Sequence, residues 1–285
     1  MSKDSKLFKF CFSLPVVVYS FMFIAIPLLY IFVISFFKSD SYGGMVYKFT
    51  LENYTELFNG AYIKIFLTSI VIALITTFIC ILIAYPFVLA VTHKSNKVQE
   101  LLMTLVMVPF LTNALIRMYG WIVLLRKYGV LNQGLMSLGF LDKPLSLMYN
   151  DFGIILGMVY TLLPFMILPL YSSVSTIDKS LLEASSDLGA SKLKTFFKII
   201  LPLSFSGLFN GALMVFTPAL GYFFIVDVLG GGKVMILGNL IKNQFLTARN
   251  WPFGAAISVF LILITTTLIW LYKKSGGNMD ELSGV

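Results

Sequence analysis

The chain has 285 residues, of which 58% are hydrophobic and 12% are charged, and its mean hydropathy is +0.90. Soluble domains usually carry about 25% charged residues, so this composition excludes a soluble globular protein. The net charge of +8 does not indicate nucleic-acid binding, because lysine and arginine also flank membrane spans on their cytoplasmic side. We therefore expect membrane lipid around this chain and no nucleic acid as a partner.

Long uncharged runs predict the membrane-spanning helices. A helix needs about 20 apolar residues to cross the hydrocarbon core of a bilayer. Six segments meet this requirement, the third of them with Arg117 inside it. The predicted spans are residues 10–37, 65–91, 101–125, 152–174, 203–226 and 252–272. The connections are too short for a soluble domain, so we expect residues 1–285 to form a single all-α polytopic membrane domain.

The connection between the fourth and fifth predicted spans, residues 176–202, has the pattern of two short helices joined by a turn. Asp178 can cap the first helix, Gly189 can end it in a left-handed conformation, and Ser191 can cap the second. The second helix has apolar residues on one face and lysines on another, and Pro202 begins the fifth span. Periodicity alone fits equally well a docking platform for another protein and an interfacial helix whose lysines contact anionic lipid.

The same connection resembles the EAA loop of ABC-transporter permease subunits. That loop has the pattern E-A-A-x3-G-x9-I-x-L-P, and the matching residues here are Glu183, Ala184, Gly189, Ile199, Leu201 and Pro202. Ser185 departs from the pattern, because it stands where the family has a second alanine.

In that family the loop is cytoplasmic and inserts into a groove on the ATPase subunit. The resemblance implies this ATPase-coupling role for Glu183, Ala184, Gly189, Leu201 and Pro202. It also implies that both termini are cytoplasmic, which the distribution of lysine and arginine favours only weakly.

Longer stretches of the sequence narrow the resemblance to one group of permease subunits. Residues 108–120, 163–166, 169–173 and 250–256 are similar to permease subunits of spermidine and putrescine importers, and the similarity extends from about residue 51 to residue 272. It implies an ATP-driven importer in the bacterial inner membrane, with a second permease subunit, two ATPase subunits that use ATP and magnesium, and an external polyamine-binding protein. Importers of a metal ion, an opine or another organic cation share the loop and are the alternative.

A path for polyamines requires carboxylates and aromatic faces at its outer mouth. Asp227 directly follows the fifth predicted span, and Tyr222 lies just before it. Tyr119 lies toward the outer end of the third span. We therefore predict that these three residues line the mouth, while capping of the outer end of the span explains Asp227 equally well.

Arg117 is the charge that interrupts the third predicted span. It lies about 24 Å along a straight helix from Leu101, which places it in the outer third of the membrane. A guanidinium would repel a polyamine, so we expect Arg117 to extend toward the outer headgroups or to pair with a carboxylate such as Asp227.

The sequence has no pattern for catalysis. It contains one histidine, His93, and neither a Cys/His metal pattern nor a G-x4-G-K-[ST] phosphate loop. We therefore expect a transport subunit with no catalytic residue, no metal and no cofactor of its own. A self-sufficient secondary carrier or channel is the less favoured alternative, because it would need charges near the membrane midplane. Apart from Arg117 the predicted spans contain none.

Overall fold

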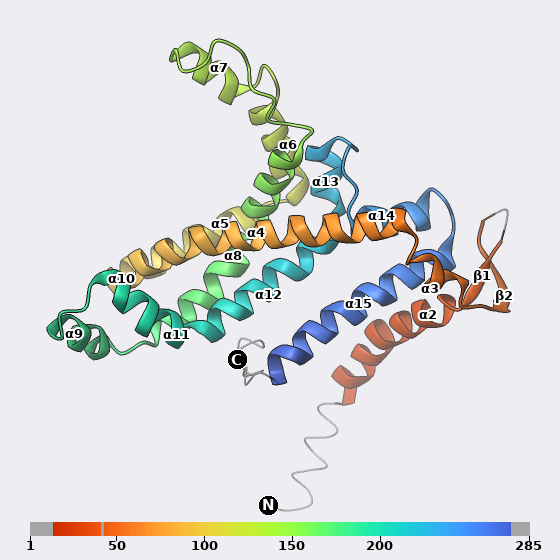
Figure 1. Cartoon of the computed structure of the whole chain (residues 1–285), viewed down its shortest axis with the longest axis horizontal. Helices are drawn as coiled ribbons and strands as arrows, with labels where there is room; N and C mark the ends of the chain where they lie inside the picture. The colour runs from red at the N-terminus through yellow and green to blue at the C-terminus, as the bar shows by residue number, and fades with distance from the viewer. Residues whose placement is uncertain (1–13, 41–42, 275–285) are drawn as a thin grey trace, which may run out of the picture. The chain divides into compact units, whose positions relative to one another are not determined.

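The computed structural model describes residues 14–40 and 43–274 (Figure 1). Residues 10–13 of the first predicted span, and both chain ends whose cytoplasmic placement is predicted, lie outside the described residues. The chain divides into two compact units, one of residues 1–63 and 240–266 and the other of residues 64–239 and 267–285. Each unit is considered by itself.

The first unit begins with a long apolar helix and a β-hairpin. Its elements are a π-helical turn η1 (Phe21–Ala25), helix α2 (Ile26–Ile34), strands β1 (Phe37–Ser39) and β2 (Met45–Phe49), and helix α3 (Glu52–Glu56). The strands pair antiparallel, which the all-helical sequence prediction did not include. Asn53 holds the hairpin to the end of α2, because its amide donates to the carbonyl oxygens of Ser35 and Phe37, each at 2.8 Å.

The second unit consists of helices joined by irregular connections, with no strand in its described part. Its elements are α5 (Asn96–Leu111), α6 (Ala114–Leu125), α7 (Val130–Ser137), α8 (Asp151–Ser175), α9 (Lys179–Asp187), α10 (Lys192–Thr195), the π-helical turn η2 (Phe196–Ile200), α11 (Leu201–Leu203), α12 (Phe205–Gly221) and α13 (Phe223–Gly230). Helices α4 (Gly60–Thr92), α14 (Leu237–Leu246) and α15 (Trp251–Lys274) have residues in both units.

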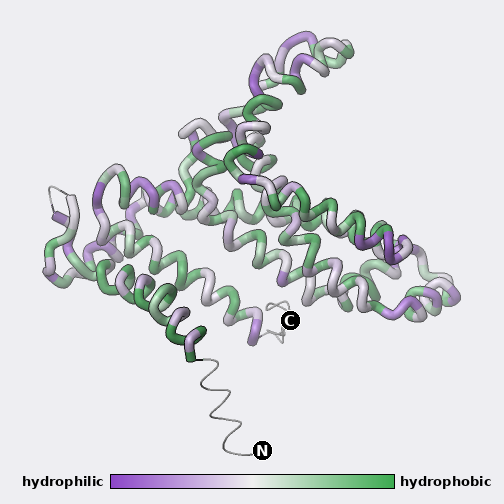
Figure 2. Tube along the Cα trace, turned by 180° about the vertical axis from the view of Figure 1, so that it is seen from behind, coloured by the Kyte–Doolittle hydropathy of each residue, from purple (hydrophilic) through white to green (hydrophobic). Residues whose placement is uncertain are grey.

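Four of the described helices are long and apolar enough to cross a membrane. They are Leu14–Ile34, Gly60–Thr92, Asp151–Ser175 and Trp251–Lys274. Two further apolar helix pairs are bent, by 92° and 71°, and counting each pair as one span gives six, the predicted number. Figure 2 shows that hydrophobic residues predominate along the long helices, whereas hydrophilic residues gather in the connecting segments. The molecule is therefore a mostly helical, multi-pass membrane protein.

The third predicted span, residues 101–125, is not one straight helix. Helix α5 ends at Leu111 and α6 begins at Ala114, and the direction of Asn96–Leu111 differs by 92° from that of Ala114–Ser137, which contains α6 and α7. Pro109 lacks an amide hydrogen and weakens the last turn of α5, while the side chain of Asn113 caps α6 by accepting from the amide of Leu115 at 2.8 Å. The depth predicted for Arg117 assumed a straight helix, which the structure does not show, so this depth stays a prediction.

Helices α8 and α12 pack closely against each other in the second unit (Figure 1). Two glycines of α12 allow this approach. A Cβ atom at Gly207 would lie 2.6 Å from the carbonyl oxygen of Pro169 and would also clash with Ser173, and one at Gly211 would lie 2.8 Å from the sulfur of Met166. Small residues at a contact between membrane helices let the two backbones approach, as they do here.

Replacing Gly207 tests this packing. Gly207→Ala should destabilise the protein by about 1–3 kcal/mol, because backbone atoms of α8 must shift to admit the methyl group. Gly120→Ala is the matched control, since Gly120 lies inside α6 with no atom within 4 Å of the added carbon. We expect a lower thermal unfolding midpoint in mild detergent for Gly207→Ala and an unchanged midpoint for Gly120→Ala. Equal midpoints for the two variants would contradict the close packing.

Candidate functional site

The connection between α8 and α12 folds as the local sequence predicts. The side chain of Asp178 caps α9 by accepting from the amide of Ser180 at 2.9 Å, and this hydrogen bond lowers the pKa of the Asp178 carboxyl group. Gly189 ends the helix with φ at +71°, a left-handed conformation that side chains disfavour. Ser191 caps α10 by accepting from the amide of Lys194 at 3.3 Å. These three predictions are confirmed.

The second helix of the loop differs from a regular α-helix. Residues 196–200 form the π-helical turn η2, in which the amide of Leu201 donates to the carbonyl oxygen of Phe196, five residues earlier. Pro202 follows within α11 and has no amide hydrogen to donate to the hydrogen bonds of the helix. Pro202 is exposed and Leu201 is half-buried. The predicted start of the fifth span at residue 203 falls in α11, and the apolar helix α12 begins at Phe205.

The loop presents a carboxylate and several apolar side chains at its surface. Glu183 and Ala184 are both exposed on α9. Leu188, Leu193 and Phe197 are 88%, 72% and 61% exposed. Exposed large apolar residues are typical of a protein or membrane contact, so their exposure is compatible with both functions predicted for this loop.

Ser185, the residue that departs from the EAA pattern, joins the two helices of the loop. It is 6% exposed, and its hydroxyl lies 2.6 Å from the hydroxyl of Thr195 at the end of α10. An alanine at this position could not make this hydrogen bond. The serine therefore fastens α9 to α10 across the Gly189 turn, a consequence that its small size alone did not predict.

A cavity of about 410 Å³ lies behind α9. Its lining includes Glu183 and Leu182 of α9, Val174 of α8, His93 of the connection between α4 and α5, and Gln99 of α5. Gln99 holds that connection to α8, because its side-chain oxygen accepts from the Tyr171 hydroxyl at 2.8 Å while its amide donates to the carbonyl oxygen of Lys94 at 2.8 Å. These two hydrogen bonds therefore join the start of α5 and the end of the α4–α5 connection to α8.

The residues predicted to line the outer mouth lie on separate elements. Asp227 is inside α13, not at the end of a continuous span, because the chain breaks at Tyr222 between α12 and α13. Its carboxylate accepts from the side-chain amide of Asn239 at 2.6 Å. Tyr222 borders a shallow hollow of about 390 Å³ together with Phe223 and Phe224.

Tyr119 lies on α6 and is 67% exposed. Among the described residues, no hydrogen bond or ring contact joins it to Tyr222 or Asp227. The structure therefore leaves the predicted grouping of these three residues as a prediction.

Arg117 lies among aromatic rings. Its guanidinium carbon is 5.5 Å from the centre of the Phe110 ring and 5.9 Å from that of Tyr160. Trp121 and Phe165 extend the cluster by edge-to-face contacts with Tyr160 and Phe110. Ring faces attract cations, and in the described residues Arg117 makes no ion pair, so the expected pairing with Asp227 is not found. The sequence contains all five residues, but their separation along the chain hides the cluster.

The structure offers little for metal chemistry in the part of the chain that it describes. No group of three or more His, Cys, Asp or Glu side chains there is arranged to hold a metal ion.

Removing the Ser185 hydroxyl should loosen the loop. A typical intramolecular hydrogen bond contributes about 0.5–1.5 kcal/mol, so Ser185→Ala should accelerate hydrogen exchange of the α9 amides roughly two- to tenfold. Ser186→Ala is the matched control, because the Ser186 hydroxyl bonds only within its own helix, to the carbonyl oxygen of Leu182 at 3.0 Å. Mass spectrometry of exchanged peptides measures both variants. Equal exchange in the two would show that the contact between Ser185 and Thr195 does not hold the loop.

Known proteins match this chain over most of its length. Residues 6–276 match the family model described as "Binding-protein-dependent transport system inner membrane component". The "Spermidine/putrescine transport system permease protein PotB" of Haemophilus influenzae is 44% identical over 253 residues, which are 89% of this chain and 88% of the relative. The protein of the same name from Escherichia coli K12 is 44% identical over 260 residues, which are 91% of this chain and 94% of the relative.

A solved structure has the same fold. One chain of a bacterial alginate ABC transporter, crystallised with an alginate pentasaccharide-bound periplasmic protein, superposes with a TM-score of 0.75 at 14% identity. The superposition covers 94% of this chain and 93% of that one. With the family model matching nearly the whole chain, these findings place the protein among known transporters: it belongs to the family of inner-membrane components of binding-protein-dependent transport systems, the permease subunits of ABC transporters.

Proposed function

We propose that this chain is the membrane-spanning permease subunit of an ATP-driven importer that carries spermidine or putrescine into the cell. The observation that carries the proposal is 44% identity to polyamine permeases over about nine-tenths of the chain. The loop between α8 and α12 supports the same conclusion, because its caps, its left-handed glycine and its exposed Glu183 fit an EAA loop.

The proposed importer contains this chain, a second permease subunit, two ATPase subunits and an external polyamine-binding protein. The ATPase subunits bind ATP and magnesium and dock on the loop through Glu183, Ala184 and Gly189, with Leu201 and Pro202 joining the loop to the membrane helices. The complex lies in the bacterial inner membrane, and both termini of this chain are cytoplasmic. The exposed Leu188, Leu193 and Phe197 supply the apolar part of the docking surface.

Purification of the complex from mild detergent tests this proposal. We expect a second permease and an ATPase to co-purify, and reconstituted vesicles that contain the loaded binding protein to take up labelled spermidine or putrescine when ATP is supplied on the loop side. A homo-oligomer that transports without ATP would contradict the proposal and favour a secondary carrier. ATP-driven uptake of a metal ion or an opine, with polyamines excluded, would contradict the assigned substrate.

The coupling role of the loop predicts the effect of two substitutions. Glu183→Lys reverses the charge of an exposed docking residue, and Gly189→Val places a β-branched residue at φ +71°. The reversed charge should weaken docking of the ATPase subunit, and backbone strain of about 1–3 kcal/mol at residue 189 should distort the loop, so each variant should lower ATP hydrolysis stimulated by the loaded binding protein roughly tenfold. Gly139→Val is the control, since Gly139 has a φ of +77° with open space around it. Normal stimulation and uptake in both loop variants would contradict the coupling role.

The proposed path predicts the effect of removing one charge. Asp227→Asn keeps an oxygen that can accept from Asn239 but removes the carboxylate. A charge-assisted hydrogen bond contributes about 1.5–3 kcal/mol, so uptake at limiting spermidine should fall about tenfold or more while assembly and basal ATP hydrolysis persist. Asp142→Asn, on the exposed connection after α7, controls for general surface charge. Unchanged uptake would remove Asp227 from the path, and loss of assembly would indicate a structural role.

A further inference from the structure

A sharp bend separates the loop from α12. The segment from Lys192 to Leu203 and the segment from Phe205 to Gly221 differ in direction by 71°. Ser204 occupies the bend and is fully buried, with φ at −97° and ψ at 9°. Any displacement of the loop therefore reaches α12 through this one residue of backbone.

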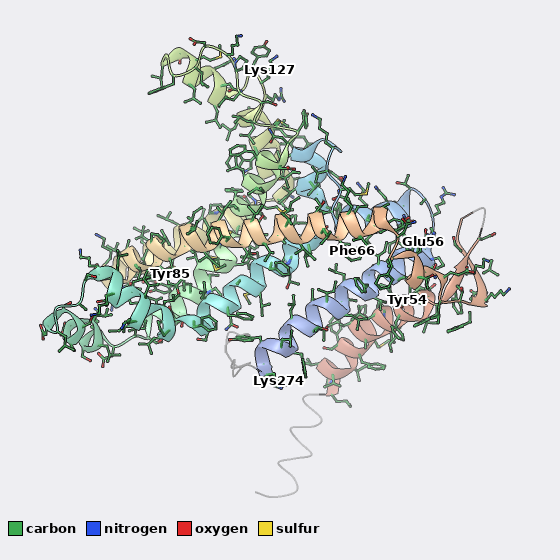
Figure 3. All side chains as sticks on the ribbon, viewed as in Figure 1. Tyr54, Glu56, Phe66, Tyr85, Lys127 and Lys274 are labelled. Carbon is green, nitrogen blue, oxygen red and sulfur yellow. The ribbon has the colours of Figure 1, made fainter. Side chains whose placement is uncertain are left out.

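Tyr85 of α4 contacts the chain before the bend and at the bend itself. Its hydroxyl lies 2.9 Å from the hydroxyl of Ser204, and its ring meets the ring of Phe196 edge-to-face with centres 5.2 Å apart. Tyr85 itself is only 6% exposed. Figure 3 shows Tyr85 on α4 beside the segment that contains α10 and α11. One side chain thus braces the bend, with its ring against the loop and its hydroxyl at the bend.

The hydrogen-bond directions at the bend follow from the available acceptors. The Ser204 hydroxyl donates to the carbonyl oxygen of Ile200 at 2.6 Å, so its only proton is used. The hydroxyl of Tyr85 must therefore donate to Ser204. The Ile200 carbonyl oxygen also accepts from the Ser204 amide at 2.9 Å. The chain of donors from Tyr85 through Ser204 to Ile200 ties α4 to the last residue of η2.

Beyond the bend, α12 has little freedom to move alone. The absence of a side chain at Gly207 brings α12 onto the backbone of α8, where even a methyl group does not fit. A force that crosses a stiff bend therefore moves packed helices together, whereas a force that reaches a loose bend is absorbed by a change of its angle. The stiffness of the bend determines which of these occurs.

We propose that Tyr85 is a positioning residue that stiffens the bend at Ser204, so that displacement of the loop is delivered to α12 and α8. This inference rests on the proposed function, because it assumes that an ATPase subunit moves the loop. Tyr85 therefore acts directly on the bend at Ser204, which joins the loop to α12. Without the brace, ATP hydrolysis continues but fewer substrate molecules cross the membrane for each ATP.

Tyr85→Phe is the decisive variant. It removes one hydroxyl, keeps the ring against Phe196, and leaves no buried group unpaired because Ser204 still donates to Ile200. Tyr171→Phe is the matched control, since it removes a tyrosine hydroxyl that is bonded at 2.8 Å to Gln99 and not to Ser204. Both variants are compared with the unmodified assembled complex in vesicles.

The first measurement is the number of spermidine molecules imported per ATP hydrolysed. We expect Tyr85→Phe to lower this ratio roughly two- to tenfold, Ser204→Ala to lower it similarly, and the double variant to be no worse than either single variant. Tyr171→Phe should keep the ratio. Partial misfolding lowers import and hydrolysis together, so it does not change the ratio. An unchanged ratio in Tyr85→Phe, or additive losses in the double variant, would contradict the proposal that Tyr85 stiffens the bend.

The second measurement does not depend on the substrate. Hydrogen exchange of the amides that follow Ser204 should be faster in Tyr85→Phe than in the unmodified complex and in Tyr171→Phe. Unchanged hydrogen exchange of these amides would contradict the proposed role of Tyr85, whichever substrate the complex transports. If the unmodified complex shows no polyamine-stimulated hydrolysis, the proposed function fails, and the exchange result still decides whether Tyr85 stiffens the bend.

Discussion

Backbone hydrogen bonding is the constraint on which this structure depends. A lipid bilayer offers no partners for amide and carbonyl groups, so a chain of this composition crosses it as helices, and every break must be repaired by side chains. The breaks described here are repaired by neighbouring polar residues: Thr112 donates to Pro109 and Asn113 caps α6 at one break, Ser204 donates to Ile200 at another, and Asn239 donates to the Phe223 carbonyl oxygen after the third. Short polar side chains thus mark the positions where the helices change direction.

These breaks coincide with the regions assigned to function. The bend at Ser204 joins the coupling loop to α12, and the break at Tyr222 separates α12 from the helix that carries Asp227. A bent helix can change its angle without losing its internal hydrogen bonds, whereas a straight one must shift as a whole. A transporter that alternates between two access states needs both behaviours. Here the packed contact of α8 with α12 and the bend at Ser204, stiffened by Tyr85 as proposed, supply the rigid part, and the breaks after Leu111 and at Tyr222 supply the positions where angles can change.

Sequence reasoning succeeded where the cause of structure is local. The caps at Asp178 and Ser191 and the left-handed Gly189 depend on residues within one turn, so their spacing identifies them. It failed where distant residues meet, as for Tyr85 with Ser204, which are 119 positions apart. The prediction of a straight third span also failed, because a proline and a capping asparagine inside an apolar run do not reveal how far the helix axis turns. How far the axis turns at this break depends on the helices that pack around it.

Arg117 shows how this chain accommodates a positive charge among apolar helices. Among the described residues, the ring faces of Phe110 and Tyr160 lie near the guanidinium and no carboxylate is paired with it. Each such contact is weaker than a buried ion pair, and it leaves the cation free to exchange one ring for another. The ammonium groups of a polyamine also need contacts that are weak enough to exchange during transport, because a site that holds its cargo too tightly cannot release it. Aromatic faces supplemented by a single carboxylate at the outer mouth would therefore suit the proposed cargo better than a cluster of buried carboxylates, and strong selection of the cargo then falls to the external binding protein.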